Sequence, residues 1–143
     1  DAFAVVPLLV SFIPMLMDTG GNCGSQSSTL IIRGLALDEI KLSDVFRVLF
    51  KEFRISLIVG AALSLANGLR IWIMYKSVTL AVVVSLSLMA TIIISKLIGG
   101  LLPLFAKKLH CDPAIMAAPL ITTIVDACSI IIYFRIATLI FHL

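Results

Sequence analysis

Four long apolar segments constrain the fold of this chain more than any other feature. They cover approximately residues 2–33, 55–75, 78–105 and 113–142, and 61% of the 143 residues are hydrophobic. A helix needs about 20 apolar residues to cross the hydrocarbon core of a bilayer. Because that core offers no water to the backbone, only helices and closed barrels can span it. The sequence therefore predicts an all-α, polytopic transmembrane bundle with four spans.

The charge content of the chain supports the same class. Charged residues make up 13% of the chain and the mean hydropathy is +1.18, whereas soluble domains contain about 25% charged residues. The net charge of +3 is small, so we expect no nucleic-acid partner. The chain begins at Asp1, with no initiator Met and almost directly in an apolar segment. We therefore expect it to be the membrane-embedded piece, residues 1–143, of a longer protein.

Basic residues gather in two of the connections between the predicted spans. Residues 33–54 hold five lysines or arginines, and residues 107–112 begin with two lysines. Because basic connections are retained in the cytoplasm, we expect both of them to face it. The short connection around Lys76 and both ends of the chain are then extracytoplasmic.

Residues 43–54, in the first basic connection, carry a helical pattern of their own. Their apolar side chains recur at three- and four-residue spacing, which predicts an amphipathic helix on the cytoplasmic side. Ser43 is a suitable N-cap for it. This helix either lies against the membrane surface or presents a docking face to a cytoplasmic regulatory domain.

Asp126 points most directly to a function. A carboxylate inside a membrane span is unfavourable by about 3 kcal/mol, so it usually faces a partner, water or an ion. At 1.5 Å per residue it lies about 20 Å along the predicted helix from Pro113, near the middle of the bilayer or slightly beyond it, towards the outside. Asp126 either binds an ion or pairs with a neighbouring Ser, Thr or Lys, and Lys96 is one candidate. The spacing of the helix puts further side chains on the same face, namely Pro119, Thr122, Ser129 and Tyr133.

The first apolar segment contains a polar patch over residues 18–28. The segment corresponds to about 45 Å of helix, which Pro7 and Pro14 are expected to kink. Polar side chains spaced for one helix face run along it, namely Asp18, Asn22, Gln26, Thr29 and Arg33. Asp18 could instead cap backbone amides, and Asn22 and Gln26 could join helices by hydrogen bonds.

The two polar faces offer carboxylate, amide and hydroxyl oxygens, which suit hard cations such as Mg²⁺, Ca²⁺ or Mn²⁺. The candidate metal-binding residues are Asp126, Asp18, Asn22, Thr122 and Thr123. The candidate pore-lining or packing residues are Gly20, Gly21, Gly24, Gln26, Ala118, Pro119 and Ser129. Because Mg²⁺ gives up its waters reluctantly, such a path suits a largely hydrated ion. In a symmetric dimer, two copies of Asp126 would face each other and favour a divalent ion.

Two stretches of the chain resemble the signature of the bacterial MgtE magnesium channels. One includes Gly20-Gly-Asn-Cys-Gly-Ser-Gln26, and the other ends in Pro119-Leu-Ile-Thr-Thr-Ile-Val-Asp126. The resemblance implies a homodimer in the bacterial plasma membrane, with a pore along the dimer axis lined by the first and fourth spans. It also implies that Asp126 is the central residue that holds a hydrated Mg²⁺.

The resemblance covers essentially the whole chain but only part of the family's architecture. Family members have five transmembrane helices, of which this chain resembles the last four. Their cytoplasmic N-terminal domain, CBS domains and plug helix, which sense Mg²⁺ and close the gate, have no counterpart here. Ala118 is an Asn in some members, so a polar contribution to the cytoplasmic gate is expected to be lost.

Other functions are compatible with parts of the pattern. The chain could transport another divalent cation such as Mn²⁺ or Co²⁺, or act as a non-conducting membrane scaffold. An intramembrane aspartyl protease using Asp18 and Asp126 is disfavoured because the Gly-x-Gly-Asp and Tyr-Asp sequences of such enzymes are absent. No phosphate-binding Gly-x-x-x-x-Gly-Lys motif occurs either, so we expect passive conduction and no enzymatic activity.

Overall fold

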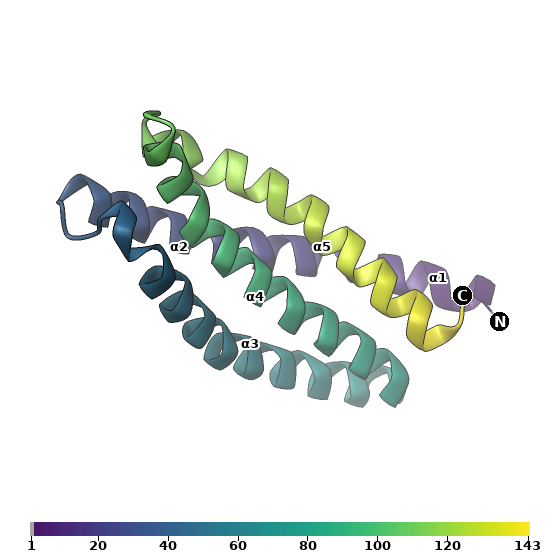
Figure 1. Cartoon of the computed structure of the whole chain (residues 1–143). Coiled ribbons are helices and arrows are strands. Elements are labelled where there is room, and N and C mark those ends of the chain that lie inside the picture. The colour runs from purple at the N-terminus through teal and green to yellow at the C-terminus, as the bar shows by residue number, and fades with distance from the viewer. Residues whose placement is uncertain (1) are drawn as a thin grey trace.

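A computed structural model describes residues 2–143, with side chains from residue 4 onward, and shows a bundle of long helices (Figure 1). The helices are α1 (Ala2–Val10), α2 (Ile13–Ala36), α3 (Val45–Tyr75), α4 (Val78–Lys108) and α5 (Ala118–Phe141). Two short 3₁₀ helices, η1 (Leu42–Asp44) and η2 (Pro113–Met116), lie in the connections. No strand occurs among the described residues, and the all-α prediction is confirmed.

Four helical segments are long and apolar enough to cross a membrane. They are Ala4–Ala36, Leu42–Tyr75, Val78–Lys108 and Ala118–Phe141. Large apolar side chains cover much of their outer surface, including Phe46, Leu65 and Leu139. An exposed apolar surface of this extent needs lipid around it, so the chain is a multi-pass membrane protein.

The helices run side by side and alternate in direction (Figure 1). The α2–α3 and α4–α5 connections lie at one end of the bundle, and the α3–α4 turn lies at the other end together with both termini. The two basic connections therefore share one end, as their expected cytoplasmic location requires. This arrangement makes α2 parallel to α4 and antiparallel to α3 and α5.

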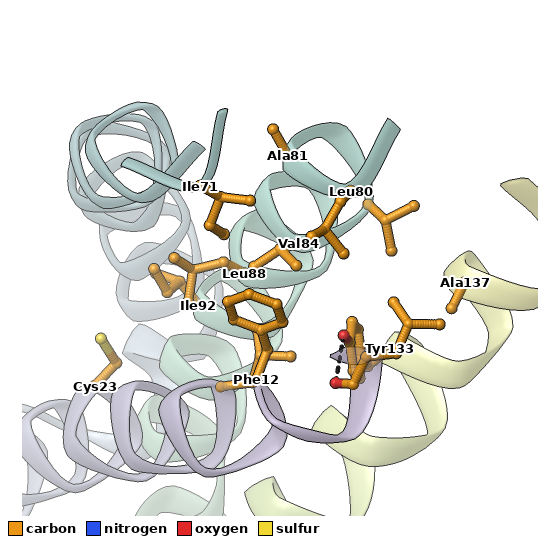
Figure 2. Packing of buried hydrophobic residues seen from close by; sticks show 13 residues of the cluster. Phe12, Cys23, Ile71, Leu80, Ala81, Val84, Leu88, Ile92, Tyr133 and Ala137 are labelled. Carbon is orange, nitrogen blue, oxygen red and sulfur yellow. Dashed lines mark hydrogen bonds between the residues drawn. The ribbon is translucent and has the colours of Figure 1, made fainter. Parts of the chain in front are cut away.

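The first predicted span consists of two helices rather than one kinked helix over residues 2–33. Ser11 and Phe12 separate α1 from α2, and Pro14 lies in the first turn of α2. Since Pro14 has no N–H, it cannot donate to the carbonyl of the residue four positions earlier, which favours a break there. Tyr133 of α5 donates a hydrogen bond of 2.7 Å to the Leu9 carbonyl beside this break (Figure 2). Pro7, by contrast, lies inside α1 without ending it.

The predicted amphipathic helix 43–54 and the second span 55–75 form one continuous helix, α3. Its 31 residues correspond to about 46 Å. The prediction of Ser43 as N-cap is wrong, because Ser43 lies inside η1 and Asp44 takes the cap position. The Asp44 carboxylate accepts a hydrogen bond of 2.9 Å from the backbone N–H of Lys41 and so stabilises the 3₁₀ turn.

A ridge of small residues on α3 packs against α4. The ridge contains Ser56, Gly60, Ser64 and Gly68, one residue per helical turn. A Cβ added to Gly60 would lie 2.5 Å from the sulfur of Met89, and one added to Gly68 would meet the hydroxyl of Ser85. The missing side chains thus allow α3 and α4 to approach closely, which is a common basis of helix association in membranes.

The apolar core lies mainly toward the end of the bundle that carries the termini. Figure 2 shows Phe12 pointing toward the α4 side chains Val84 and Leu88. Tyr133 and Leu16 belong to the same cluster and are almost fully buried. A smaller cluster toward the other end joins α2, α3 and α4 through Ile31, Leu35, Val48 and Leu104.

The fourth span begins later than predicted. Residues 113–116 form η2, Ala117 is extended, and α5 starts at Ala118 rather than at Pro113. The Asp112 carboxylate accepts a hydrogen bond of 2.9 Å from the Ala114 N–H and so caps η2. Ser28 of α2 donates to the Met116 carbonyl, which attaches η2 to the first span.

Candidate functional site

Glycines on α2 bring this helix into close contact with α5. A Cβ added to Gly20 would lie 2.9 Å from Val125, and one added to Gly24 would lie 2.8 Å from Ile121. A Cβ on Gly21 would lie 3.1 Å from the Cγ2 of Thr122. These contacts leave no room for larger side chains, so the glycines act as the close-packing residues of the two helices that carry the polar faces.

The structure places the polar faces of α2 and α5 next to each other and leaves them uncovered. Asp18, Asn22 and Gln26 are exposed on α2, and Thr122 and Asp126 are half-buried on α5. The position of a Cβ on Gly21 is 3.9 Å from an oxygen of Asp126, which locates the carboxylate at the α2–α5 seam. Exposed polar groups within a membrane span are unfavourable against lipid, so this surface requires water, an ion or another protein chain.

Asp126 lies nearer one end of its helix than the sequence suggested. Because α5 starts at Ala118, the carboxylate is eight residues, or about 12 Å, from the helix start. The expected 20 Å was counted from Pro113, which belongs to η2. Asp126 therefore lies in the half of the bundle that holds the two basic connections, and its predicted position at or beyond the middle, away from these connections, is wrong.

The second turn of α5 supplies oxygen atoms close to Asp126. The hydroxyls of Thr122 and Thr123 both donate to the Pro119 carbonyl, at 3.1 and 2.9 Å. Because each hydroxyl proton is used in this bond, both hydroxyl oxygens keep lone pairs that can accept a hydrogen bond from water or bind a cation. Ala118 and Pro119 are exposed at the entrance to this turn.

Two residues predicted on the face of Asp126 are buried instead. Ser129 is 1% exposed and Tyr133 is fully buried. The Ser129 hydroxyl donates to the Val125 carbonyl at 2.7 Å and faces Gly20 of α2. Tyr133 is covered because its hydroxyl reaches Leu9 of α1. Neighbouring helices thus cover the outer part of the predicted stripe, and Ser129 has a packing role.

Lys96, a candidate partner for Asp126, has other partners. Its ammonium group donates to Gln26 Oε1 and to Ser27 Oγ, both at 3.3 Å. Ser27 in turn donates to Glu52 of α3 at 2.5 Å. Ser27 and Glu52 were not predicted from the sequence. One signal could have indicated that Glu52 is buried. It precedes Ser56 by four residues and so lies on the same helix face as the small-residue ridge of α3.

The residues near Asp126 do not form a dense metal cluster within one chain. Among residues 2–143, no group of three His, Cys, Asp or Glu side chains is placed to hold a metal ion. An ion at the α2–α5 seam would therefore meet one carboxylate together with hydroxyl, amide and water oxygens. Such a set of hard oxygen ligands fits Mg²⁺ or Ca²⁺ better than it fits zinc or copper.

Comparison with known proteins identifies the family of this chain. The family model MgtE, a divalent cation transporter, matches residues 13–136. The Magnesium transporter MgtE of Bacillus subtilis is 40% identical over 142 residues, covering 99% of this chain and 32% of the relative. Its namesake in Thermus thermophilus is 38% identical over 135 residues, covering 94% of this chain and 30% of the relative.

A third relative, the Magnesium transporter MgtE of Enterococcus faecalis, is 33% identical over 132 residues, which cover 92% of this chain and 29% of the relative. The chain thus spans about a third of the length of these relatives. The matched region contains both glycine-lined α2 and the Asp126 segment of α5. The chain belongs to the MgtE family of divalent cation transporters.

Proposed function

We propose that this chain is the pore-forming part of a magnesium channel. In this proposal α2 and α5 of two identical chains line a path along the dimer axis, and Asp126 binds the ion. The observation that carries the proposal is the uncovered polar surface formed by Asp18, Asn22, Thr122 and Asp126 on membrane-spanning helices. The relatives, which are named magnesium transporters, support Mg²⁺ as the ion.

A second copy of the chain would cover this exposed polar surface. The polar faces of α2 and α5 in the two chains would then face each other and enclose water between them. Two Asp126 carboxylates would then face one path and match the charge of one divalent cation. A monovalent ion would leave one negative charge uncompensated in a low-dielectric setting, which favours the divalent ion.

The side chains around Asp126 suit an ion that keeps its water. Mg²⁺ holds its waters tightly and prefers octahedral geometry. Asp18, Asn22, Thr122 and Thr123 would contact those waters, while Gly20, Gly21 and Gly24 keep the wall thin and closely packed. Ala118 and Pro119 would form the mouth of the path at the end with the basic connections.

The surroundings of the path follow from the same proposal. The protein would reside in the bacterial plasma membrane, with the basic connections in the cytoplasm and both ends of this segment outside. Conduction would be passive, driven by the ion gradient and the membrane potential. Cytoplasmic regulatory domains elsewhere in the full-length protein would control it.

Reconstitution of the full-length protein in liposomes tests this function. With Mg²⁺ outside and a fluorescent Mg²⁺ indicator inside, we expect influx without added nucleotide. Competition by Mn²⁺, Co²⁺ and Ca²⁺ then ranks the ions. Preference for Mn²⁺ or Co²⁺ over Mg²⁺ would identify a different divalent cation as the substrate. Absence of any cation flux from folded, inserted protein would indicate a scaffold and contradict the proposal.

A further inference from the structure

Three polar side chains outside the proposed ion path are buried together between α2, α3 and α4. Lys96 is 3% exposed, Glu52 is 2% exposed and Ser27 is fully buried. Burying a charged group inside a membrane bundle is costly unless the charge is paired and hydrogen-bonded. Their joint burial needs a reason beyond the packing of apolar side chains.

The hydrogen bonds among these side chains have one consistent direction. Lys96 Nζ donates to Ser27 Oγ at 3.3 Å, and Ser27 Oγ donates to Glu52 Oε2 at 2.5 Å. An ammonium group can only donate and an ionised carboxylate can only accept, whereas a hydroxyl does both. Ser27 is therefore the relay that lets a positive charge on α4 and a negative charge on α3 stabilise each other through α2.

The relay lies beside the closest approach of the helices. A Cβ added to Gly99 would collide with the backbone carbonyl of Gly24, and one added to Gly100 would lie 3.1 Å from the Cγ of Glu52. A Cβ added to Gly24 would itself meet Ile121 and Val125 of α5, and Val125 directly precedes Asp126. A displacement of α2 at the relay would therefore be transmitted to the α5 segment that carries Asp126.

Lys96 also sets the orientation of Gln26, which is exposed on α2. Its second donor bond, of 3.3 Å, goes to Gln26 Oε1. Because an ammonium group attracts only the oxygen of an amide, the two N–H bonds of Gln26 point away from Lys96. Gln26 thus presents donors, which suit water, and the positive charge beside its oxygen disfavours a cation there.

We propose that Lys96 is a positioning residue of the ion path. With Ser27 and Glu52 it forms a charge-neutral brace that fixes α2 against α3 and α4, and its charge disfavours a cation at the Gln26 oxygen. This inference rests on the proposed function, because the position of α2 matters for transport only if α2 lines the path.

The test uses the full-length protein in liposomes and measures Mg²⁺ flux per folded molecule together with the melting temperature. Ser27→Ala removes the relay and keeps both charges. Its matched control is Ser87→Ala, since Ser87 is equally buried but donates only to Val83 of its own helix, at 2.7 Å. Lys96→Met removes the charge, with exposed Lys51→Met as its control.

We expect Ser27→Ala and Lys96→Met to lower the maximal flux roughly fivefold or more, while both controls keep wild-type flux. The double variant Lys96→Met/Glu52→Gln removes both charges. Its melting temperature should recover above that of Lys96→Met, because no buried charge is left unpaired. Its flux should stay low, because the brace is still missing.

Two results would overturn the inference. One is wild-type flux in both Ser27→Ala and Lys96→Met. The other is recovery of flux together with stability in the double variant, which would make the network structural only. If the wild-type protein itself carries no Mg²⁺, the proposed function is wrong, and this inference is wrong as well. If the wild type carries Mg²⁺ and one of the two results above is found, only this inference is wrong.

Discussion

Two groups of polar side chains within the bundle differ in what surrounds them. Tyr133 and Lys96 are buried and donate to groups on other helices. Asn22 and Asp126 instead lie on the uncovered surface of α2 and α5. Only the second group is accessible from outside the chain. The first group holds in place the helices on which the second group lies.

The hydroxyl of Tyr133 is expected to stabilise the folded protein. Tyr133→Phe removes the hydrogen bond to the Leu9 carbonyl, which is left buried beside the α1–α2 break. We expect a loss of about 1 to 2 kcal/mol in the free energy of unfolding, measured by thermal melting in detergent. The control is Tyr75→Phe, which removes a hydroxyl from an exposed tyrosine. Equal melting temperatures for the two variants would contradict the role assigned to Tyr133.

At the scale of elements, the contact of α2 with α4 and α5 depends on Gly24. Gly24→Leu would drive a side chain into Ile121, which a Cβ alone would approach to 2.8 Å, and into the Ser95 carbonyl at 3.2 Å. Because overpacking of this kind typically costs about 1 to 3 kcal/mol, we expect less folded protein and reduced dimer assembly. Size-exclusion chromatography in detergent measures both.

Ala62→Leu is the matched control for this variant, because Ala62 is exposed on the outer surface of α3. It places the same leucine side chain where lipid can accommodate it. Normal assembly and Mg²⁺ flux in Gly24→Leu would show that α2 does not need its close approach to the neighbouring helices.

The number and type of elements could be predicted from sequence because each span is a long apolar run. Their starts were less predictable. Pro113 and Pro119 are both suited to the first turn of a helix, and only Pro119 lies in the first turn of α5. The choice depends on contacts distant in sequence, such as the hydrogen bond from Ser28 to Met116. Likewise, the break before Pro14 is accompanied by a bond from Tyr133, on another helix.

The candidate site was predictable in part for a related reason. Periodicity assigns Asp126, Ser129 and Tyr133 to one face of a helix, but it does not show which neighbour covers that face. The structure separates them, because α1 and α2 cover the outer part of α5 and leave Asp126 accessible. The link from Lys96 through Ser27 to Glu52 was equally hidden, since Glu52 belongs to the continuous helix α3 and not to a separate surface helix.

At the scale of the whole molecule, both basic connections lie at the same end of the bundle (Figure 1). If that end is cytoplasmic, exposed Cys111 in the α4–α5 connection should react with a membrane-impermeant maleimide only in inside-out vesicles. The assay uses full-length protein in which other reactive cysteines are replaced. Thr79→Cys, in the first turn of α4, should show the opposite pattern. Labelling of Cys111 in intact cells would reverse the proposed orientation.

In the proposed function, Asp126 lies on the path for Mg²⁺. This role can be tested in a bacterium that cannot grow at low Mg²⁺, carrying the full-length protein with or without Asp126→Asn at matched membrane expression. The control is Asp38→Asn, in the α2–α3 connection, where the positive φ of 56° is one that Asn tolerates. We predict growth with the wild type and with Asp38→Asn, and no growth with Asp126→Asn. Equal growth with Asp126→Asn would contradict the account and leave Asp126 with a structural role.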